Sequence, residues 1–299
     1  MRILVTGANG LLGRKLVSLL DRQPEIYSMA SARKAISFYT GTSESILLDV
    51  TDASMVNDVV LKTRPDVIIN AAAMTQVDQC EQDKEECWKQ NVGSVTNLVE
   101  VCFRNNIHLV HLSTDFIFNG KEGPLDESAI PEPVNYYGES KLEGEKIILN
   151  SRCSATIIRT VLVYGVTSDM SRSNIVLWVK KNLEDKKPIR VVNDQYRTPT
   201  LAEDLAMGCL LASQKQATGI YHVSGYEMMT PYDIAITTAD FFGLDKGLIS
   251  PATDFIQPAK RPLKTGFIID KAKRELGYKP HSFSEGLKIV AEQLRELQG

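Results

Sequence analysis

The chain has 299 residues, of which 43% are hydrophobic and 24% are charged, and its formal net charge is -3. This length and composition allow a large buried core, either in one domain or in two smaller ones. The weak negative charge gives no electrostatic reason to expect binding to nucleic acid or to an anionic membrane. No apolar run approaches the ~20 residues that a membrane-spanning helix needs.

The cysteines and histidines indicate neither a disulfide framework nor a metal site. The five cysteines are scattered, odd in number and never spaced as C-x-x-C, so we interpret them as reduced, packed thiols. The four histidines lack metal-ligand spacing, and we interpret all of them as structural. The N-terminus runs straight into a hydrophobic strand and leaves no room for a signal peptide. We therefore expect a soluble, cytoplasmic protein without a metal.

The first expected element is a strand that ends in a glycine-rich turn. Ile3-Leu4-Val5 is apolar, glycines follow at positions 7, 10 and 13, and leucines then recur at helical spacing. Glycines at these positions let the backbone turn tightly and let a pyrophosphate approach the N-terminus of the helix. We interpret the segment as a dinucleotide-binding turn rather than an ordinary tight βα turn. Its candidate cofactor contacts are Gly7, Asn9, Gly10, Leu11, Leu12 and Gly13.

The segment after the second expected strand, residues 26–30, indicates which dinucleotide is bound. An Asp or Glu at this place would accept a hydrogen bond from the 2′-hydroxyl of the adenosine ribose. The sequence instead reads Ser31-Ala32-Arg33-Lys34, which could hold a 2′-phosphate. We therefore predict NADPH, with NADH as the alternative cofactor and a solvated basic loop as the competing interpretation. Ser31 and Arg33 are the candidate contacts.

Further cofactor contacts are expected after the next two strands. The strand at 46–50 contains Asp49, whose carboxylate could accept from the adenine amino group, and Val50. The strand at 66–70 is followed by Ala71, Ala72 and Ala73. Their small side chains would let a flat cofactor lie against the backbone, although three alanines are also compatible with a simple turn. A long helix is expected over 79–105.

The strand at 107–112 leads to the residues that are candidates for catalysis. It ends in Ser113-Thr114-Asp115, which places a hydroxyl at the carboxyl edge of the sheet, where open parallel sheets bind ligands. A loop over 119–135 then delivers the chain to Tyr137 and Lys141 at the start of a helix. Residues four apart share a helix face, so the ammonium can approach the phenol and lower its pKa. The spacing alone is weak, because it occurs by chance on many solvated helices.

Repeated β-α-β units with short connections predict an α/β fold with a doubly wound, parallel Rossmann sheet. Beyond residue 159 the pattern loosens, yet a helix at 201–212 and a strand at 219–223 are expected to return to the sheet. Residues 249–264 have no regular pattern. We expect a Rossmann domain over 1–165 that regains elements near 198–225. Residues 166–299 should form mainly a smaller, interleaved lobe that covers the substrate.

The glycine turn, the Ser113-Thr114-Asp115 strand end and the Tyr137–Lys141 pair, in this order, resemble the extended short-chain dehydrogenase/reductase superfamily. Within it the chain resembles the dTDP-4-dehydrorhamnose reductases. The likeness covers nearly the whole chain and is carried by the segments 70–81, 113–120, 137–145, 159–165, 194–200 and 204–206.

The resemblance implies that the protein reduces a 4-keto sugar nucleotide with NADPH. It implies that Tyr137 donates a proton to the developing alkoxide, that Thr114 hydrogen-bonds the same oxygen, and that Lys141 binds the nicotinamide ribose. Asn91 would orient Lys141 through water. The implied substrate contacts are Thr75, Val77, Asp115, Phe116 and Arg197. The fork of Arg197 suits a phosphate, and a salt bridge in the second lobe is an equal alternative.

Two departures from the family pattern leave the sugar open. Leu162 stands where these reductases usually carry a tryptophan, and Met74 stands where they often have histidine. One alternative is an epimerase or dehydratase of nucleotide sugars that holds NAD tightly. Another is a non-catalytic protein similar to the regulatory subunit of methionine adenosyltransferase. The sequence leaves open the oligomeric state, a homodimer included, and any metal at an interface.

Overall fold

The computed structural model describes residues 1–299 except 37, 39–40, 42–43, 168–173, 254–257 and 298–299. Its larger part is a seven-stranded sheet in the order β10-β6-β5-β4-β1-β2-β3, and every neighbouring pair is parallel. The strand order reverses between β1 and β4, which is where doubly wound sheets bind their ligands. The predicted fold class is confirmed. The strands are β1 (Arg2–Thr6), β2 (Tyr27–Ala32), β3 (Glu44–Leu47), β4 (Val67–Asn70), β5 (His108–Thr114), β6 (Ala155–Thr160) and β10 (Gly219–His222).

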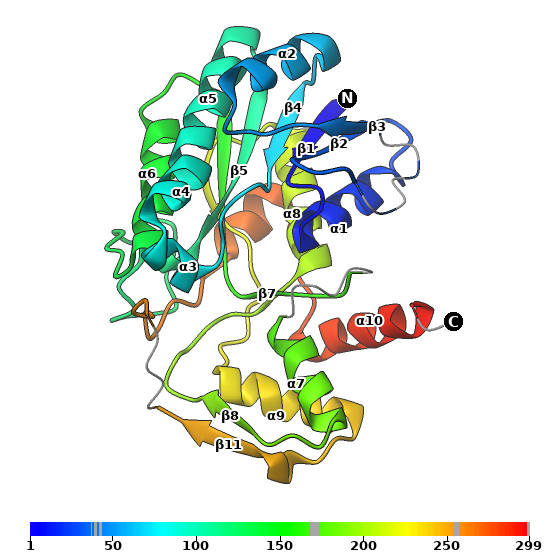
Figure 1. Cartoon of the computed structure of the whole chain (residues 1–299), viewed down its shortest axis with the longest axis vertical. Coiled ribbons are helices and arrows are strands. Elements are labelled where there is room, and N and C mark those ends of the chain that lie inside the picture. Colours follow the sequence, from blue (N-terminus) through cyan, green and yellow to red (C-terminus); the bar gives the residue numbers. More distant parts are fainter. Residues whose placement is uncertain (37, 39–40, 42–43, 168–173, 254–257, 298–299) are drawn as a thin grey trace.

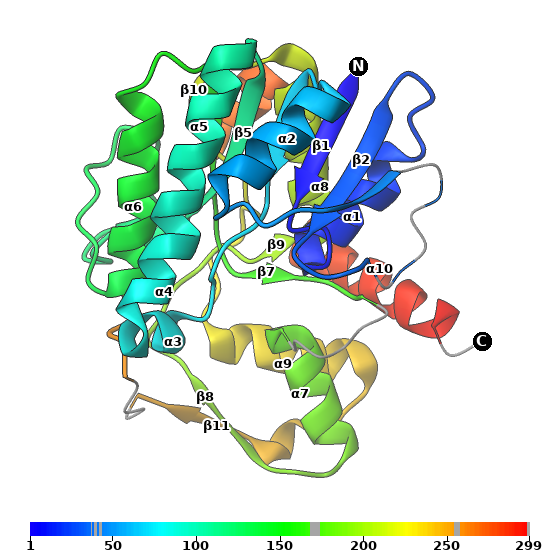
Figure 2. The same cartoon turned by 45° about the horizontal axis from the view of Figure 1, so that its top comes forward.

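Helices cover both faces of this sheet (Figures 1 and 2). One face packs against α1 (Leu11–Leu20) and α8 (Ala202–Lys215) through a core that includes Ile3 and Val5. The other face packs against α2 (Ala53–Thr63), α5 (Ser94–Asn105) and α6 (Tyr136–Leu149) through a core that includes Leu4 and Ile68. Strands buried on both faces read as continuous apolar runs, which is why β1 and β4 were recognisable in the sequence.

The smaller part lies below the carboxyl edge of the sheet in Figure 1. It contains α7 (Ile175–Glu184), α9 (Pro231–Phe242) and the parallel strands β8 (Ile189–Val192) and β11 (Ile249–Ala252). α10 (Phe283–Glu296) joins the same part through Phe283 and Leu287. The short strands β7 (Val163–Tyr164) and β9 (Thr200–Leu201) pair where the chain passes between the two parts. Among the described residues, none of the helices has the length and apolar character required to cross a bilayer.

Two strand predictions need correction. β2 runs to Ala32 rather than ending at residue 30, because Ser31 and Ala32 pair with Ile46 and Leu47 of β3. β3 itself spans Glu44–Leu47, so residues 48–50 follow the strand instead of forming its end.

The expected long helix over 79–105 is also wrong, because several short elements replace it. They are α3 (Val77–Gln82), α4 (Lys84–Trp88), a π-helical turn (Lys89–Gly93) and α5. The break falls at Asp83, whose side chain accepts from the Glu86 N–H and thereby caps α4. Such local capping by Asp competes with continuation of a helix.

Residues 249–264 are not irregular throughout, since 249–252 form β11. Pro251 is tolerated there because β11 lies at the edge of a two-stranded sheet. Part of that expectation, residues 254–257, lies outside the described residues. The chain later returns to the main core through Phe267, Ile269 and Tyr278.

Candidate active site

The glycine-rich turn is shaped to receive a phosphate group. Gly7 has φ +69°, and a Cβ on it would lie 2.7 Å from the backbone nitrogen of Ala72. A Cβ on Gly13 would lie 2.3 Å from the Gly7 carbonyl oxygen. α1 starts at Leu11 with Gly10 as an N-cap that makes no side-chain hydrogen bond, so the N–H groups of the first turn point out of the helix unpaired. This cradle of backbone donors fits the pyrophosphate of a dinucleotide.

Asn9 and Thr6 connect this turn to its neighbours. Asn9 donates through Nδ2 to the Lys34 and Ala35 carbonyls, both at 3.3 Å. Its Oδ1 is buried without a partner among the described residues. The Ala72 N–H faces Thr6 Oγ1 at 3.4 Å, so the alanine segment after β4 lies directly beside the turn.

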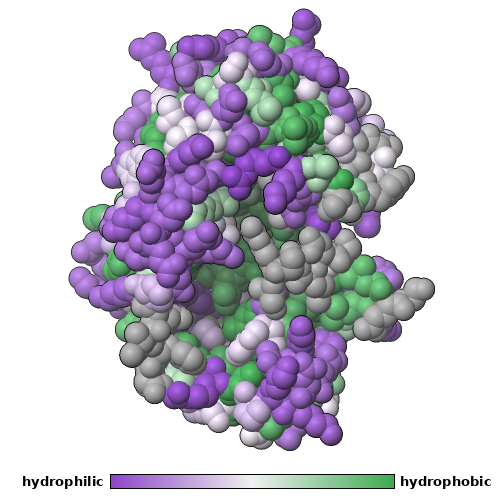
Figure 3. Space-filling model, in the orientation of Figure 1, coloured by the Kyte–Doolittle hydropathy of each residue, from purple (hydrophilic) through white to green (hydrophobic). Residues whose placement is uncertain are grey.

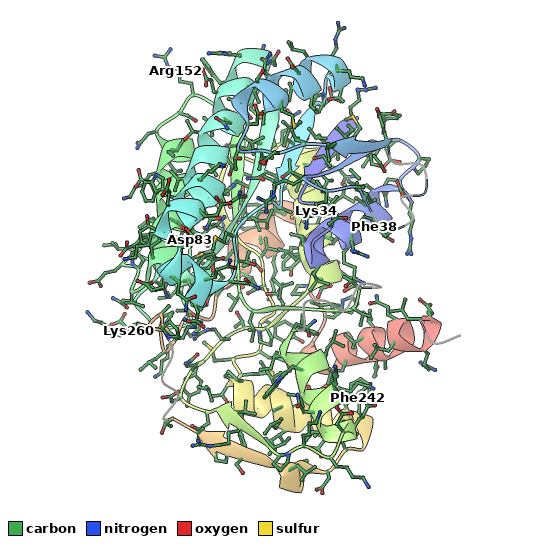
Figure 4. All side chains as sticks on the ribbon, viewed as in Figure 1. Lys34, Phe38, Asp83, Arg152, Phe242 and Lys260 are labelled. Atoms are coloured by element: carbon green, nitrogen blue, oxygen red, sulfur yellow. The ribbon has the colours of Figure 1, made fainter. Side chains whose placement is uncertain are left out.

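The two candidates for 2′-phosphate binding in residues 31–34, Ser31 and Arg33, differ in exposure. The Ser31 hydroxyl is buried and donates to the Val5 carbonyl at 2.9 Å, so it faces the sheet interior and not a 2′-phosphate. Arg33 is exposed, with its guanidinium 3.8 Å from the Glu86 carboxylate. Figure 4 marks Lys34 just beyond β2 and Asp83 between α3 and α4, and α4 is the helix that the Arg33–Glu86 contact reaches. Asp49 is half-buried just beyond β3, and its Oδ1 accepts from the Thr51 hydroxyl at 2.8 Å.

The first turn of α6 holds Tyr137 against the end of β5. Asn135 caps the helix by accepting from the Gly138 N–H at 2.9 Å, and Glu81 accepts from the Tyr136 N–H at 3.0 Å. A Cβ on Gly138 would lie 2.1 Å from the Phe116 carbonyl oxygen. Glycine therefore allows the close approach that brings the phenol beside the residues following β5.

Tyr137 and Thr114 meet at this junction. The Tyr137 ring contacts the Phe116 ring edge-on, with centroids 5.7 Å apart. Burial raises the pKa of Tyr137, and a hydrogen bond with Thr114 opposes that shift. The predicted lowering of the phenol pKa by Lys141 is therefore wrong, because desolvation of the phenolate outweighs the opposing contacts.

Lys141 is buried one turn further along α6. Its surroundings lower the pKa of Lys141 to about 8, mainly by burial, while the Glu145 carboxylate opposes the shift. Its Nζ lies 3.4 Å from Nε2 of His111 on β5. His111 was predicted to be structural, because no local motif pairs it with Lys141.

Asn91 lies in the π-helical turn and ties α6 to the loop after β4. Its amide accepts from the Met74 N–H at 2.9 Å and donates to the Met74 carbonyl at 3.0 Å. It also donates to the Ser140 hydroxyl at 3.0 Å. These contacts fix Met74 relative to α6, and the water-mediated contact between Asn91 and Lys141 stays a prediction. π-helical turns of this kind are frequent at functional sites.

Arg197 forms a salt bridge, as the alternative to phosphate binding had it, but its partner lies at the end of β5 and not in the second lobe. Its Nε lies 3.4 Å from the Asp115 carboxylate, and both side chains are buried. Its Nη atoms donate to the backbone carbonyls of Tyr196, Pro262 and Leu263 at 2.6 to 3.1 Å. These bonds occupy the fork of the guanidinium, so the structure does not present Arg197 to a phosphate. Burial raises the pKa of Asp115, and Arg197 opposes that shift.

The remaining substrate candidates border Tyr137. Val77, Phe116 and Met74 pack in one cluster with the tyrosine, whereas Thr75 is exposed beside it. Leu162 adopts φ 37° between β6 and β7, a backbone conformation that is uncommon for leucine. On the face shown in Figure 3, hydrophobic residues line a recess between the upper and lower parts.

Arg261 lies near the site but was not among the candidates predicted from the sequence. Its guanidinium lies 2.9 Å from Asp78 and 6.0 Å from the centre of the Phe116 ring. It lies in the segment that showed no periodic pattern, so no signal distinguished it from other surface arginines. Within the described ranges, no group of three or more His, Cys, Asp or Glu side chains could hold a metal ion.

A doubly wound sheet with a glycine turn at its switch point, and a Thr-Tyr-Lys set beside it, defines an extended short-chain dehydrogenase/reductase. The chain belongs to the RmlD substrate binding domain family, whose model matches residues 1–296. This bears out the predicted resemblance.

Three comparisons show how far the likeness extends. A dTDP-4-dehydrorhamnose reductase of Aggregatibacter actinomycetemcomitans is 33% identical over 303 residues, which cover 97% of this chain and 98% of that protein. The methionine adenosyltransferase 2 subunit beta of Xenopus laevis is 32% identical over 85% of this chain and 75% of its own length. The crystal structure of the Bacillus anthracis dTDP-4-dehydrorhamnose reductase in complex with NADP has a TM-score of 0.86 at 29% identity. The structural match covers 98% of this chain and 99% of the Bacillus anthracis chain.

Proposed function

We propose that the protein is a cytoplasmic, NADPH-dependent reductase of a 4-keto sugar nucleotide that acts in carbohydrate biosynthesis, as in the formation of dTDP-rhamnose. The observation that carries the proposal is that Thr114 and the buried Tyr137 and Lys141 meet at the carboxyl edge of the sheet, the edge at which β1 enters the glycine turn. The similarity to dTDP-4-dehydrorhamnose reductases over the full length supports it.

The cofactor supplies the hydride when it is bound. The turn formed by Gly7, Asn9, Gly10, Leu11, Leu12 and Gly13 would hold its pyrophosphate, in keeping with the cradle that the glycines leave open. Arg33 would contact the 2′-phosphate, since its guanidinium is exposed. Asp49 and Val50 would border the adenine, and Ala71, Ala72 and Ala73 would let the cofactor lie against the backbone.

Residues of the protein would supply the proton that the alkoxide oxygen takes up. Tyr137 is protonated at neutral pH, as an unperturbed tyrosine is, and burial raises its pKa further. It can therefore donate a proton to the alkoxide that develops from the ketone. The Thr114 hydroxyl would hydrogen-bond the same oxygen. Lys141 would hold the nicotinamide ribose, and Asn91 would keep the Met74 loop in place.

We propose the following division of labour. Residues 1–165, with the elements near 198–225, hold the cofactor, and the remainder of 166–299 mainly covers the substrate. Thr75, Val77, Asp115 and Phe116 would border the sugar nucleotide, whereas Arg197 would support the pocket through Asp115. The protein could work as a homodimer, which sedimentation would test.

The likeness to a methionine adenosyltransferase subunit favours a second candidate, a non-catalytic cofactor-binding protein. The reductase would turn over a keto sugar with NADPH, whereas the non-catalytic protein would only bind the cofactor. The joint presence of Thr114, Tyr137 and Lys141 in one buried junction supports catalysis.

NADPH oxidation against a panel of nucleotide-linked 4-keto sugars tests the proposal. We expect Tyr137→Phe to lose at least ~100-fold in kcat, in line with removal of a general acid, while NADPH still binds. Tyr27→Phe is the control, because Tyr27 is 45% exposed on β2. Near wild-type turnover by Tyr137→Phe would discard the mechanism. NADPH binding without turnover of any substrate would favour the regulatory candidate, and purification with one equivalent of oxidised NAD would favour an epimerase or dehydratase.

A further inference from the structure

A row of buried polar side chains crosses the sheet and ends at Lys141. The strand register aligns Thr6 of β1 with Asn70 of β4, and Asn70 with His111 of β5. Thr6 Oγ1 lies 2.6 Å from Asn70 Oδ1, and Asn70 Nδ2 lies 3.2 Å from His111 Nδ1. The other ring nitrogen of His111 lies 3.4 Å from Lys141 Nζ. The row therefore runs from the cofactor turn to the catalytic helix.

Each of these groups is almost completely buried. Thr6, Asn70 and His111 are each 1% exposed, and Lys141 is 3% exposed. A buried polar group without a partner loses about 1–3 kcal/mol of stability. Each buried group therefore needs a partner, and the donor or acceptor role of one group sets the role of the next along the row.

The charge of Lys141 fixes the direction of the hydrogen bonds. An ammonium has only donors, so the imidazole nitrogen facing it accepts a hydrogen bond. Burial and the lysine charge keep His111 neutral, with a pKa well below its ordinary value. Neutral His111 then carries its hydrogen on Nδ1, and the Asn70 amide presents its oxygen to the ring. This arrangement assigns the oxygen of the Asn70 amide to the position facing His111 and the nitrogen to the position facing Thr6, with the side chain otherwise unmoved. The Thr6 hydroxyl oxygen then accepts a hydrogen bond from the Asn70 amide.

We propose that His111, held in one tautomer by Asn70, is a positioning residue that accepts a hydrogen bond from the Lys141 ammonium. It thereby aims the lysine at the cofactor ribose and keeps it protonated. The catalytic part of this inference rests on the proposed function, whereas the contact itself does not.

A glycine on α6 leaves space for the contact between His111 and Lys141. A Cβ on Gly144 would lie 3.7 Å from His111 Nε2 and 3.2 Å from the Asn91 carbonyl oxygen, so glycine leaves room for the ring beside the lysine.

Other ionisable groups around the ammonium do not replace His111. Glu145 on α6 raises the pKa of Lys141, but both of its oxygens accept from the Arg159 guanidinium at 2.7 to 3.2 Å. The thiols of Cys87 on α4 and Cys80 on α3 also raise the pKa of Lys141. Tyr137, one turn back on α6, stays neutral because burial raises the pKa of its phenol.

The test compares His111 variants by two pH profiles. One is kcat/KM for ketone reduction, and the other is NADPH affinity measured by fluorescence. His111→Leu removes the acceptor, and we expect the alkaline midpoint of both profiles to fall by about one pH unit. His111→Gln places an amide near the position of Nε2 and should restore the wild-type midpoint. His108→Gln is the matched control, because His108 contacts Ser154 and Thr156 and should leave both midpoints unchanged.

A positioning role and a merely structural one give different results. A structural His111 would change the unfolding midpoint in all variants while the pH midpoints stayed at the wild-type value, which would overturn the inference. If His111→Leu does not fold, His111→Asn replaces it, since its shorter amide can meet Asn70 but cannot reach Lys141. If wild-type protein reduces no ketone, the proposed function fails, and the NADPH affinity profile alone still decides the role of His111.

Discussion

Neutralising Glu145 should strongly destabilise the protein, because this carboxylate forms a buried ion pair with the guanidinium of Arg159. Glu145 and Arg159 lie between α6 and β6, with side chains 1% and 3% exposed. Three N–O distances of 2.7, 3.0 and 3.2 Å join the groups. Arg159 Nη1 is buried and has no partner in the described part of the chain.

Removing one member of a buried ion pair costs about 3–5 kcal/mol, since the other charge is left uncompensated. We expect Glu145→Gln to fall near the lower end, ~3 kcal/mol, because the amide oxygen can still accept one N–H. The assay is urea unfolding followed by circular dichroism.

Two control variants separate charge from packing. Glu143→Gln changes an exposed carboxylate on the same helix, paired with Lys146 at 3.1 Å, and should cost less than ~1 kcal/mol. The double variant Glu145→Met with Arg159→Met removes both charges and should recover most of the lost stability. The reasoning is refuted if Glu145→Gln costs no more than Glu143→Gln.

Three further predictions concern the site and the second lobe. Because burial lowers the pKa of Lys141 to about 8, kcat/KM should be high below that pH and fall as pH rises through it; a rate that stays constant far above it would contradict this. Gly13→Ala should abolish NADPH binding, since its Cβ would lie 2.3 Å from the Gly7 oxygen, whereas Gly93→Ala meets nothing within 4 Å and should bind normally. Equal binding by both variants would argue against the cradle. Thr230→Ala removes the capping box of α9 and should lower stability by ~1 kcal/mol without changing NADPH affinity; an unchanged urea midpoint would contradict this.

The elements that could be predicted are those whose signal is local. β1, β4 and β5 are apolar runs, and parallel strands bring their carboxyl ends to one edge whatever the surrounding side chains do. That geometry brings the glycine turn and Thr114 to one edge of the sheet, and the first turn of α6 adds Tyr137. The strand expected at 219–223 was likewise predicted to return to the main sheet, where the structure has β10 beside β6.

Features that depend on distant partners could not be predicted. Arg197 has its charge partner and its carbonyl acceptors far along the chain, in Asp115 and residues 262–263. β11 exists because it pairs with β8, and no periodicity marks it in the sequence. The break at Asp83 reflects one side-chain cap that competes with an otherwise helical pattern.

The shifts at Tyr137 and Lys141 have one cause and opposite consequences. Burial disfavours the charged form of each group, so it raises the pKa of the phenol and lowers that of the amine. The phenol thus carries the proton that ketone reduction requires, but its raised pKa makes it a weaker acid than a donor whose pKa lies near the working pH. The lysine, in contrast, must keep a charge that burial opposes, and it does so through Glu145 and a neutral acceptor on β5. Because His111 is in turn aligned through Asn70 with Thr6 at the cofactor turn, changes in that turn should also alter the pH at which Lys141 loses its charge.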